Sequence, residues 1–166
     1  MKCIFLIALI VLCGLRKDTA AGVPRHRDRS SARSPPLGNQ HTMQHVQKLA
    51  QAAQEFDEEA NIRLIPKFQH TKNMNLYVCC LHANILDFYL WNILTTENNY
   101  PSLEKVRTDL GRVSRDLSEQ GCSIMHVDNH EYSRKFKEGF HKLGKTAVNK
   151  AIGEIDILFD SLNIFC

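Results

Sequence analysis

The sequence contains little glycine and proline, with 8 and 5 respectively among 166 residues. This scarcity excludes collagen-like and low-complexity chains. The apolar run near the start, from Cys3 to Leu15, is too short to span a bilayer, and no later stretch approaches the roughly 20 apolar residues that a spanning helix needs. The formal net charge of +3 is far from the strongly basic balance typical of nucleic-acid binders. We therefore expect a globular protein that neither inserts into membranes nor binds nucleic acid.

Motifs that would indicate catalysis are also missing. The sequence has no H-E-x-x-H zinc motif, no G-x-S-x-G nucleophile elbow and no glycine-rich phosphate loop. A catalytic zinc site needs three protein ligands and a structural one needs four, and the pair His41 and His45 supplies only two. We interpret His126, Asp128 and His130 as a polar connector, with a metal site as the alternative. The sequence thus predicts no enzymatic activity, no cofactor and no metal.

The N-terminus is typical of an export signal. Lys2 precedes the apolar run, and the small residues Thr19, Ala20 and Ala21 follow it. We expect residues 1–21 to be removed and the remaining chain to be secreted into the extracellular space.

Residues 22–40 are expected to form a basic, flexible N-terminal segment ahead of the folded domain. Four arginines against Asp28 give residues 22–36 a net charge of +3, whereas residues 37–166 carry −2. Serine and proline are frequent here and large apolar residues are rare, so the segment cannot bury enough surface to fold. The alternative is weak adhesion to sulfated glycans or membrane surfaces through Arg25–Arg29.

The chain from His41 to Cys166 shows the apolar periodicity of helices almost throughout. One of its helices is apolar on most of its circumference, Trp91 included, which is typical of the middle of a bundle. Gly121 is expected to end the helix that contains Leu103–Leu117. The pattern predicts an all-α fold, a compact bundle of five or six helices over residues 41–166. The apolar segments are Met43–Phe56, Leu76–Leu94, Leu103–Leu117, Tyr132–Leu143 and Thr146–Phe165.

Four cysteines remain after the export signal: Cys79, Cys80, Cys122 and Cys166. In an exported chain this even number predicts two disulfides. A bridge between the adjacent Cys79 and Cys80 is sterically poor in a helix, because neighbouring side chains point about 100° apart. Two connectivities remain open, and each ties the central helix both to the Cys122 loop and to the chain end.

Three segments resemble a known family. They are K-A-I-G-E-I-D-I-L-F at Lys150–Phe159, N-I-R-L-I at Asn61–Ile65 and C-C-L-H-A-N-I-L-D-F-Y-L at Cys79–Leu90. Together they closely resemble the interleukin-10 family of class II helical cytokines, over most of residues 41–166. The resemblance implies the helical cytokine fold and the disulfides Cys79–Cys166 and Cys80–Cys122.

The resemblance also implies a function. Such a ligand bridges two class II cytokine receptor chains, one selective and one shared with interleukin-10, and triggers JAK/STAT signalling in epithelial defence. A soluble binding protein is a further expected partner, and the chain is expected to act as a monomer. The rival interpretation is a basic-tailed, secreted host-defence protein that acts on membranes.

In this family the selective receptor chain docks on the loop after the first helix and on the last helix. The resemblance therefore implies receptor-binding roles for Asn61, Arg63, Lys150, Glu154 and Asp156. Two alternatives stay open from the residues themselves. Lys150 and Glu154, four residues apart, would also form an ordinary exposed ion pair, and Arg63 would also serve as an internal tie from the loop to the bundle.

Gly153 lies in the middle of the last expected helix, where glycine costs roughly 1 kcal/mol relative to alanine. Something should compensate for this cost. We expect a tight contact with a neighbouring helix, with exposure of the backbone to a receptor as the alternative.

Overall fold

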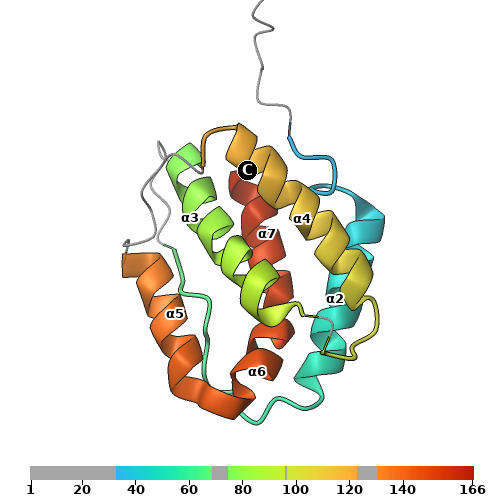
Figure 1. Cartoon of the computed structure of the whole chain (residues 1–166), viewed down its shortest axis with the longest axis vertical. Coiled ribbons are helices and arrows are strands. Elements are labelled where there is room, and N and C mark those ends of the chain that lie inside the picture. Colours follow the sequence, from blue (N-terminus) through green and yellow to red (C-terminus); the bar gives the residue numbers. More distant parts are fainter. Residues whose placement is uncertain (1–32, 69–74, 96, 123–130) are drawn as a thin grey trace, which may run out of the picture. The chain divides into compact units, whose positions relative to one another are not determined.

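The computed structural model describes residues 33–68, 75–95, 97–122 and 131–166. These residues contain no β-strand, and their helices form one bundle (Figure 1). The all-α fold predicted from periodicity is therefore confirmed. The α-helices are α2 (Gln40–Gln54), α3 (Asn75–Phe88), α4 (Leu103–Glu119), α5 (Glu131–Leu143), α6 (Ala147–Gly153) and α7 (Ile155–Phe165), with a π-helical turn η1 (Tyr89–Ile93) after α3 and a 3₁₀ turn η2 (Gly144–Thr146) between α5 and α6.

The folded domain begins earlier than the sequence predicted. Arg33 donates hydrogen bonds to the backbone oxygen and to Oδ1 of Asn163 in α7, at 2.7 and 2.8 Å. Ser34 and Leu37 are buried, and the Asn39 side chain caps α2. The expected flexible segment over 22–40 is thus corrected from Arg33 onward, because these side chains have partners on the bundle that composition does not reveal. The expected export signal and Arg25–Arg29 lie outside the described residues.

Helix α7 lies at the centre of the bundle. It packs against α2 and α3, while α4 packs against both α2 and α3, and α5 packs against α3 and α6 (Figure 1). The inward residues of α4 repeat at steps of three and four and are all buried, as the sequence predicted. They are Leu103, Val106, Leu110, Val113 and Leu117. The central helix α7 contributes Ile155, Leu158, Phe159 and Leu162 to the same core.

Both disulfides implied by the resemblance are present. Cys79 is joined to Cys166 and Cys80 to Cys122. Adjacent residues on α3 therefore reach two different destinations, since their side chains leave the helix in different directions. Cys122 is brought into place by Gly121, whose φ of +105° ends α4 with hydrogen bonds from Gly121 N to Ser118 O and from Cys122 N to Leu117 O. This is the glycine-ended turn that the sequence predicted.

Two apolar residues assigned to buried helix faces are exposed. Phe56 follows the last turn of α2, so it leaves the helical register, and it is 69% exposed. Trp91 lies in η1 and is 81% exposed, because the neighbouring helices cover other sectors of this segment. The segment from Leu76 to Leu94 is therefore apolar all round but not buried all round.

A buried histidine joins four parts of the domain. His82 Nδ1 lies 2.8 Å from Val78 O, and its Nε2 lies 2.9 Å from the hydroxyl of Tyr132 in α5. A carbonyl only accepts, so Nδ1 carries a proton; when the ring is neutral, Nε2 then accepts from the Tyr132 hydroxyl. Phe165 of α7 stacks on the imidazole, and Phe68 contacts both the imidazole and the Tyr132 ring edge-on. Burial lowers the pKa of His82 below its usual value.

We predict that His82 makes the domain less stable in acid. The unfolded chain binds a proton at His82 at about pH 6.5, while the lowered pKa delays protonation in the folded state, so stability falls as pH drops from 6.5 towards the folded pKa. Below pH 6.5, His82 lowers the free energy of unfolding by up to about 1.4 kcal/mol for each pH unit. Urea unfolding at pH 7.5 and 5.5 measures it. His82→Gln should lose this part of the pH dependence, whereas His41→Gln, which removes an exposed imidazole, should keep it; equal losses in both variants would contradict the prediction.

Candidate functional site

A buried carboxylate binds the backbone of the loop between α2 and α3. Glu154 lies where the last helix breaks into α6 and α7, and it is 5% exposed. Its carboxylate accepts hydrogen bonds from the backbone N–H groups of Leu64, at 3.1 and 3.0 Å, and Ile65, at 2.9 Å. Pro66 favours an extended Ile65, so these two N–H groups find no partner in a helix of their own. The sequence predicted one continuous helix here; the break directs Glu154 to the loop.

Lys150 connects this carboxylate to the other end of the loop. Its Nζ lies 2.8 Å from Asp57 Oδ2 and 3.4 Å from Glu154 Oε1, and all three side chains are almost buried. Asp57 Oδ1 also accepts a hydrogen bond from the backbone of Glu59. A buried charge is tolerated only when it is paired and hydrogen-bonded, and this group meets both conditions. We call Asp57, Lys150 and Glu154 the loop clamp.

Helix α6 also holds the start of the loop through its backbone and through Asn149. Gln54 donates a hydrogen bond of 2.6 Å from Nε2 to Gly153 O, and Asn149 donates one of 2.7 Å to Phe56 O. An ideal Cβ on Gly153 would lie 3.3 Å from Gln54 Cγ. The close helix contact expected at Gly153 is therefore present, between α6 and the end of α2.

Five residues between the clamped points face solvent, and the last three of them are consecutive: Asn61, Ile62 and Arg63. Arg63 donates a hydrogen bond of 2.8 Å from Nε to Ile65 O, which is a tie within the loop and leaves the guanidinium on the surface. The backbone beside it cannot move freely, because the next residue is bonded to Glu154. The loop thus presents an arginine and an asparagine from a fixed backbone.

Two of the predicted receptor-binding residues are not on this surface. Lys150 and Glu154 are each 5% exposed, so neither offers its charge to a partner, and neither forms the exposed ion pair that was the alternative. Their spacing did place them on one helix face, but periodicity does not show that a loop covers this face. Their role is to position the loop.

Asp156 is half-buried at the start of α7. Burial raises the pKa of its carboxyl, the hydrogen bond from Ile157 N opposes this effect, and the negative charge of Asp160 adds to it. Within the described part of the chain, no cation lies at ion-pair distance from Asp156. A cation supplied by a partner would therefore stabilise the ionised form.

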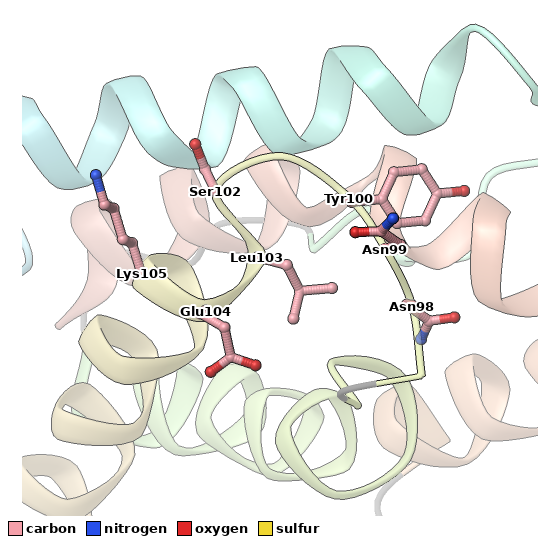
Figure 2. A pocket seen from close by; sticks show the side chains of 7 residues that line it. All are labelled: Asn98, Asn99, Tyr100, Ser102, Leu103, Glu104 and Lys105. Carbon is pink, nitrogen blue, oxygen red and sulfur yellow. The ribbon is translucent and has the colours of Figure 1, made fainter.

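A hollow that the sequence does not predict lies at the start of α4. Figure 2 shows its lining, which consists of Asn98, Asn99, Tyr100, Ser102, Leu103, Glu104 and Lys105. Ser102 has a left-handed backbone with φ of 66°, and the Tyr100 hydroxyl binds Asn149 in α6. A second hollow, between the first half of α2 and α4, shares Glu104 and Lys105. The only sequence signal was the break at Asn98–Pro101.

The His, Cys, Asp and Glu side chains of the described residues are not gathered into a metal-binding group. No group of three His, Cys, Asp or Glu side chains among them lies close enough to hold a metal ion. The histidines and aspartate of the expected polar connector, at 126–130, lie outside the described residues. Among the helices that the structure describes, none is both long and apolar enough to cross a membrane.

Comparisons with known proteins agree with this geometry. The family model described as "Interleukin 22 IL-10-related T-cell-derived-inducible factor" matches residues 33–166. Human interleukin-22 is 33% identical over 172 residues, which cover 99% of this chain and 89% of the relative. Mouse interleukin-22b is 35% identical over 92 residues, which cover 53% of this chain and 50% of the relative. The crystal structure of zebrafish interleukin-22 superposes with a TM-score of 0.69 and 29% identity, covering 81% of this chain and 98% of that one.

The helical bundle, its two disulfides and the clamped loop define a helical cytokine of the interleukin-10 class. Within that class, the family match over residues 33–166 and the identity to the human protein lead to one group. The chain belongs to the interleukin-22 family.

We predict that Glu154→Gln lowers the free energy of unfolding by about 2 kcal/mol, because the amide leaves a buried backbone N–H without its acceptor and weakens the pairing of Lys150. Glu138→Gln, at an exposed position on α5, is the matched control and should cost less than about 0.5 kcal/mol. Denaturant unfolding of the two variants measures the difference. Equal effects would show that Glu154 does not support the loop.

We predict that Gly153→Leu lowers the free energy of unfolding by about 1–3 kcal/mol, since its side chain overpacks the contact with Gln54. Gly153→Ala should be nearly neutral, because its Cβ requires only a small movement of a flexible glutamine and the helix gains propensity. Thermal melting of both variants is the measurement. A leucine variant with wild-type melting and impaired receptor binding would favour backbone exposure to a receptor instead.

Proposed function

We propose that this chain is a secreted ligand that bridges two class II cytokine receptor chains and triggers JAK/STAT signalling in epithelial defence. One chain would resemble the selective interleukin-22 receptor and the other the shared interleukin-10 receptor. Membership of the interleukin-22 family supports this proposal. The observation that carries it is the clamped loop, with Asn61 and Arg63 exposed on it.

The loop suits receptor binding because it is ordered before the partner arrives. Asp57, Lys150 and Glu154 hold the loop at residue 57 and at residues 64–65, so less backbone freedom is lost on association. Arg63 can hold a partner carboxylate with two parallel hydrogen bonds, and arginine is enriched among the residues that dominate interface energies. Asp156, whose carboxylate would gain from a partner cation, supplies the opposite charge. We propose Asn61, Arg63 and Asp156 as the docking residues for the selective chain.

A bridging ligand also needs a second surface that does not overlap the first. The hollow between α2 and α4 lies at the first half of α2, whereas the loop leaves from the end of that helix. At 1.5 Å per residue, about 15 Å of helix separates them. We propose this hollow for the shared chain. The ligand is expected to act as a monomer, since each receptor chain then meets its own surface, and a soluble binding protein would compete at the loop.

We predict that Arg63→Ala weakens binding to the selective receptor ectodomain by about 1–3 kcal/mol, mainly through faster dissociation. Its helical circular dichroism and melting temperature should not change, because the side chain is exposed and the hydrogen bond it donates to Ile65 O stays within the loop. Surface plasmon resonance is the measurement. Arg115→Ala, on the exposed surface of α4, removes the same charge elsewhere and should bind as the wild type does.

Two outcomes would contradict these proposals at different levels. Wild-type dissociation of Arg63→Ala would remove Arg63 from the docking surface, and a large fall in melting temperature would make it a structural residue. A wild-type chain that binds no class II ectodomain and causes no STAT phosphorylation in epithelial cells would overturn the bridging function itself.

A further inference from the structure

Positive charge is concentrated on one helix of an otherwise acidic domain. Residues 131–145, which cover α5 and most of η2, contain five lysines and arginines against two glutamates, a net charge of +3. All other residues from 37 onward sum to −5. Helix α4 is longer than α5 and has four charged residues of each sign, so its net charge is zero. The excess is thus specific to α5.

The carboxylates on α5 are already engaged by cations of the same helix. Glu131 lies 2.7 Å from Lys135, and Glu138 lies 3.8 Å from Arg134. The other three cations form no ion pair within the described part of the chain. We define the α5 basic face by Arg134, Lys135, Lys137, Lys142 and Lys145.

The α5 basic face is long and purely polar. Its 13-residue helix is about 20 Å long. The aromatic side chains of α5 turn inward, where Tyr132 and Phe136 are buried. The large apolar side chains exposed in the described residues all lie on other segments: Phe56, Ile62, Leu76, Trp91 and Ile164. A surface without apolar residues does not favour insertion into a bilayer interface.

The loop after α2 extends the positive surface along its edge. Leu64 Cδ2 lies 3.3 Å from an ideal Cβ on Gly139, and the Phe68 ring lies 5.8 Å from the Tyr132 ring, so residues 64–68 run beside α5 (Figure 1). Lys67, between these two contacts, is exposed. Lys67 and the cations of the α5 basic face therefore form an elongated positive surface, which we call the cation strip.

We propose that the α5 basic face binds a sulfated glycosaminoglycan. A linear polyanion matches a linear strip of cations, and each lysine that replaces a small counterion on the polymer contributes to binding in a salt-dependent way. Lys137, Lys142 and Lys145 contribute most, because no carboxylate of the described residues lies at ion-pair distance from them. This site uses residues other than the N-terminal arginines and does not depend on the proposed receptor function.

The test uses the whole secreted chain on immobilised heparin at several NaCl concentrations. The triple variant Lys137→Gln, Lys142→Gln, Lys145→Gln should elute at lower salt than the wild type. The slope of log affinity against log salt should fall by about 2, from three lost contacts at about 0.7 each. The control on α4, Lys105→Gln, Arg107→Gln, Arg115→Gln, loses the same charge and should elute close to the wild type.

Each alternative has its own result, and each would overturn the proposal. Equal shifts in both triple variants would indicate net charge alone, and unchanged elution of the α5 variant would assign heparin binding to another segment, such as the N-terminal arginines. Sedimentation with phosphatidylserine vesicles that the α5 variant loses, together with unchanged heparin binding, would make the partner a membrane. Should the triple variant fail to fold by circular dichroism, Lys142→Glu alone replaces it and should still elute earlier.

Discussion

The interaction on which the functional surface depends is the buried ion pair between Lys150 and the carboxylates of Asp57 and Glu154. Removing three charged side chains from water is costly, and the pairing offsets this only because the backbone N–H groups of Leu64 and Ile65 also bond to the carboxylate of Glu154. A hydrophobic replacement of similar volume would fill the space but could not hold two backbone N–H groups. The clamp therefore fixes a position of the loop as well as contributing to stability.

The other features of the last helix follow from this requirement. A continuous α-helix would direct residue 154 along the regular helical face; the break after Gly153 gives Glu154 a φ of −105° and ψ of 10°, and its carboxylate reaches the loop. Gly153 has no side chain to hold α2 away, so Gln54 can bond to its carbonyl oxygen. One disulfide acts at the opposite end of this helix, where Cys166 is tied to α3, and the other ties α3 to Cys122 after α4. Closing 87 and 42 residues, they contribute about 4–5 kcal/mol each in the chain-entropy model.

Much of this architecture was predictable from the sequence, and the exceptions have physical causes. The buried stripe of α4 repeats every three or four residues, and a glycine follows its end, so both the helix and its stop were predicted. The break at Gly153–Glu154 was not, because the apolar residues on either side continue a helical pattern. Trp91 was assigned to the core on its hydrophobicity, but exposure depends on which sectors the neighbouring helices cover. Periodicity shows on which face of a helix a residue lies, but it does not show whether a neighbouring element covers that face.

The functional surface shows the same distinction between spacing and environment. Asn61–Ile65 and Lys150–Phe159 suggested the family, and these two segments are bonded to each other through Glu154. Within them, Lys150 and Glu154 build the support, while Asn61 and Arg63 remain exposed on the loop that it holds. A charged motif that resembles a family can therefore reflect how a loop is positioned, rather than which residues contact a partner. Substitutions in the support should alter stability and binding together, whereas substitutions of the exposed residues should alter binding alone, and this difference separates the two roles in one set of measurements.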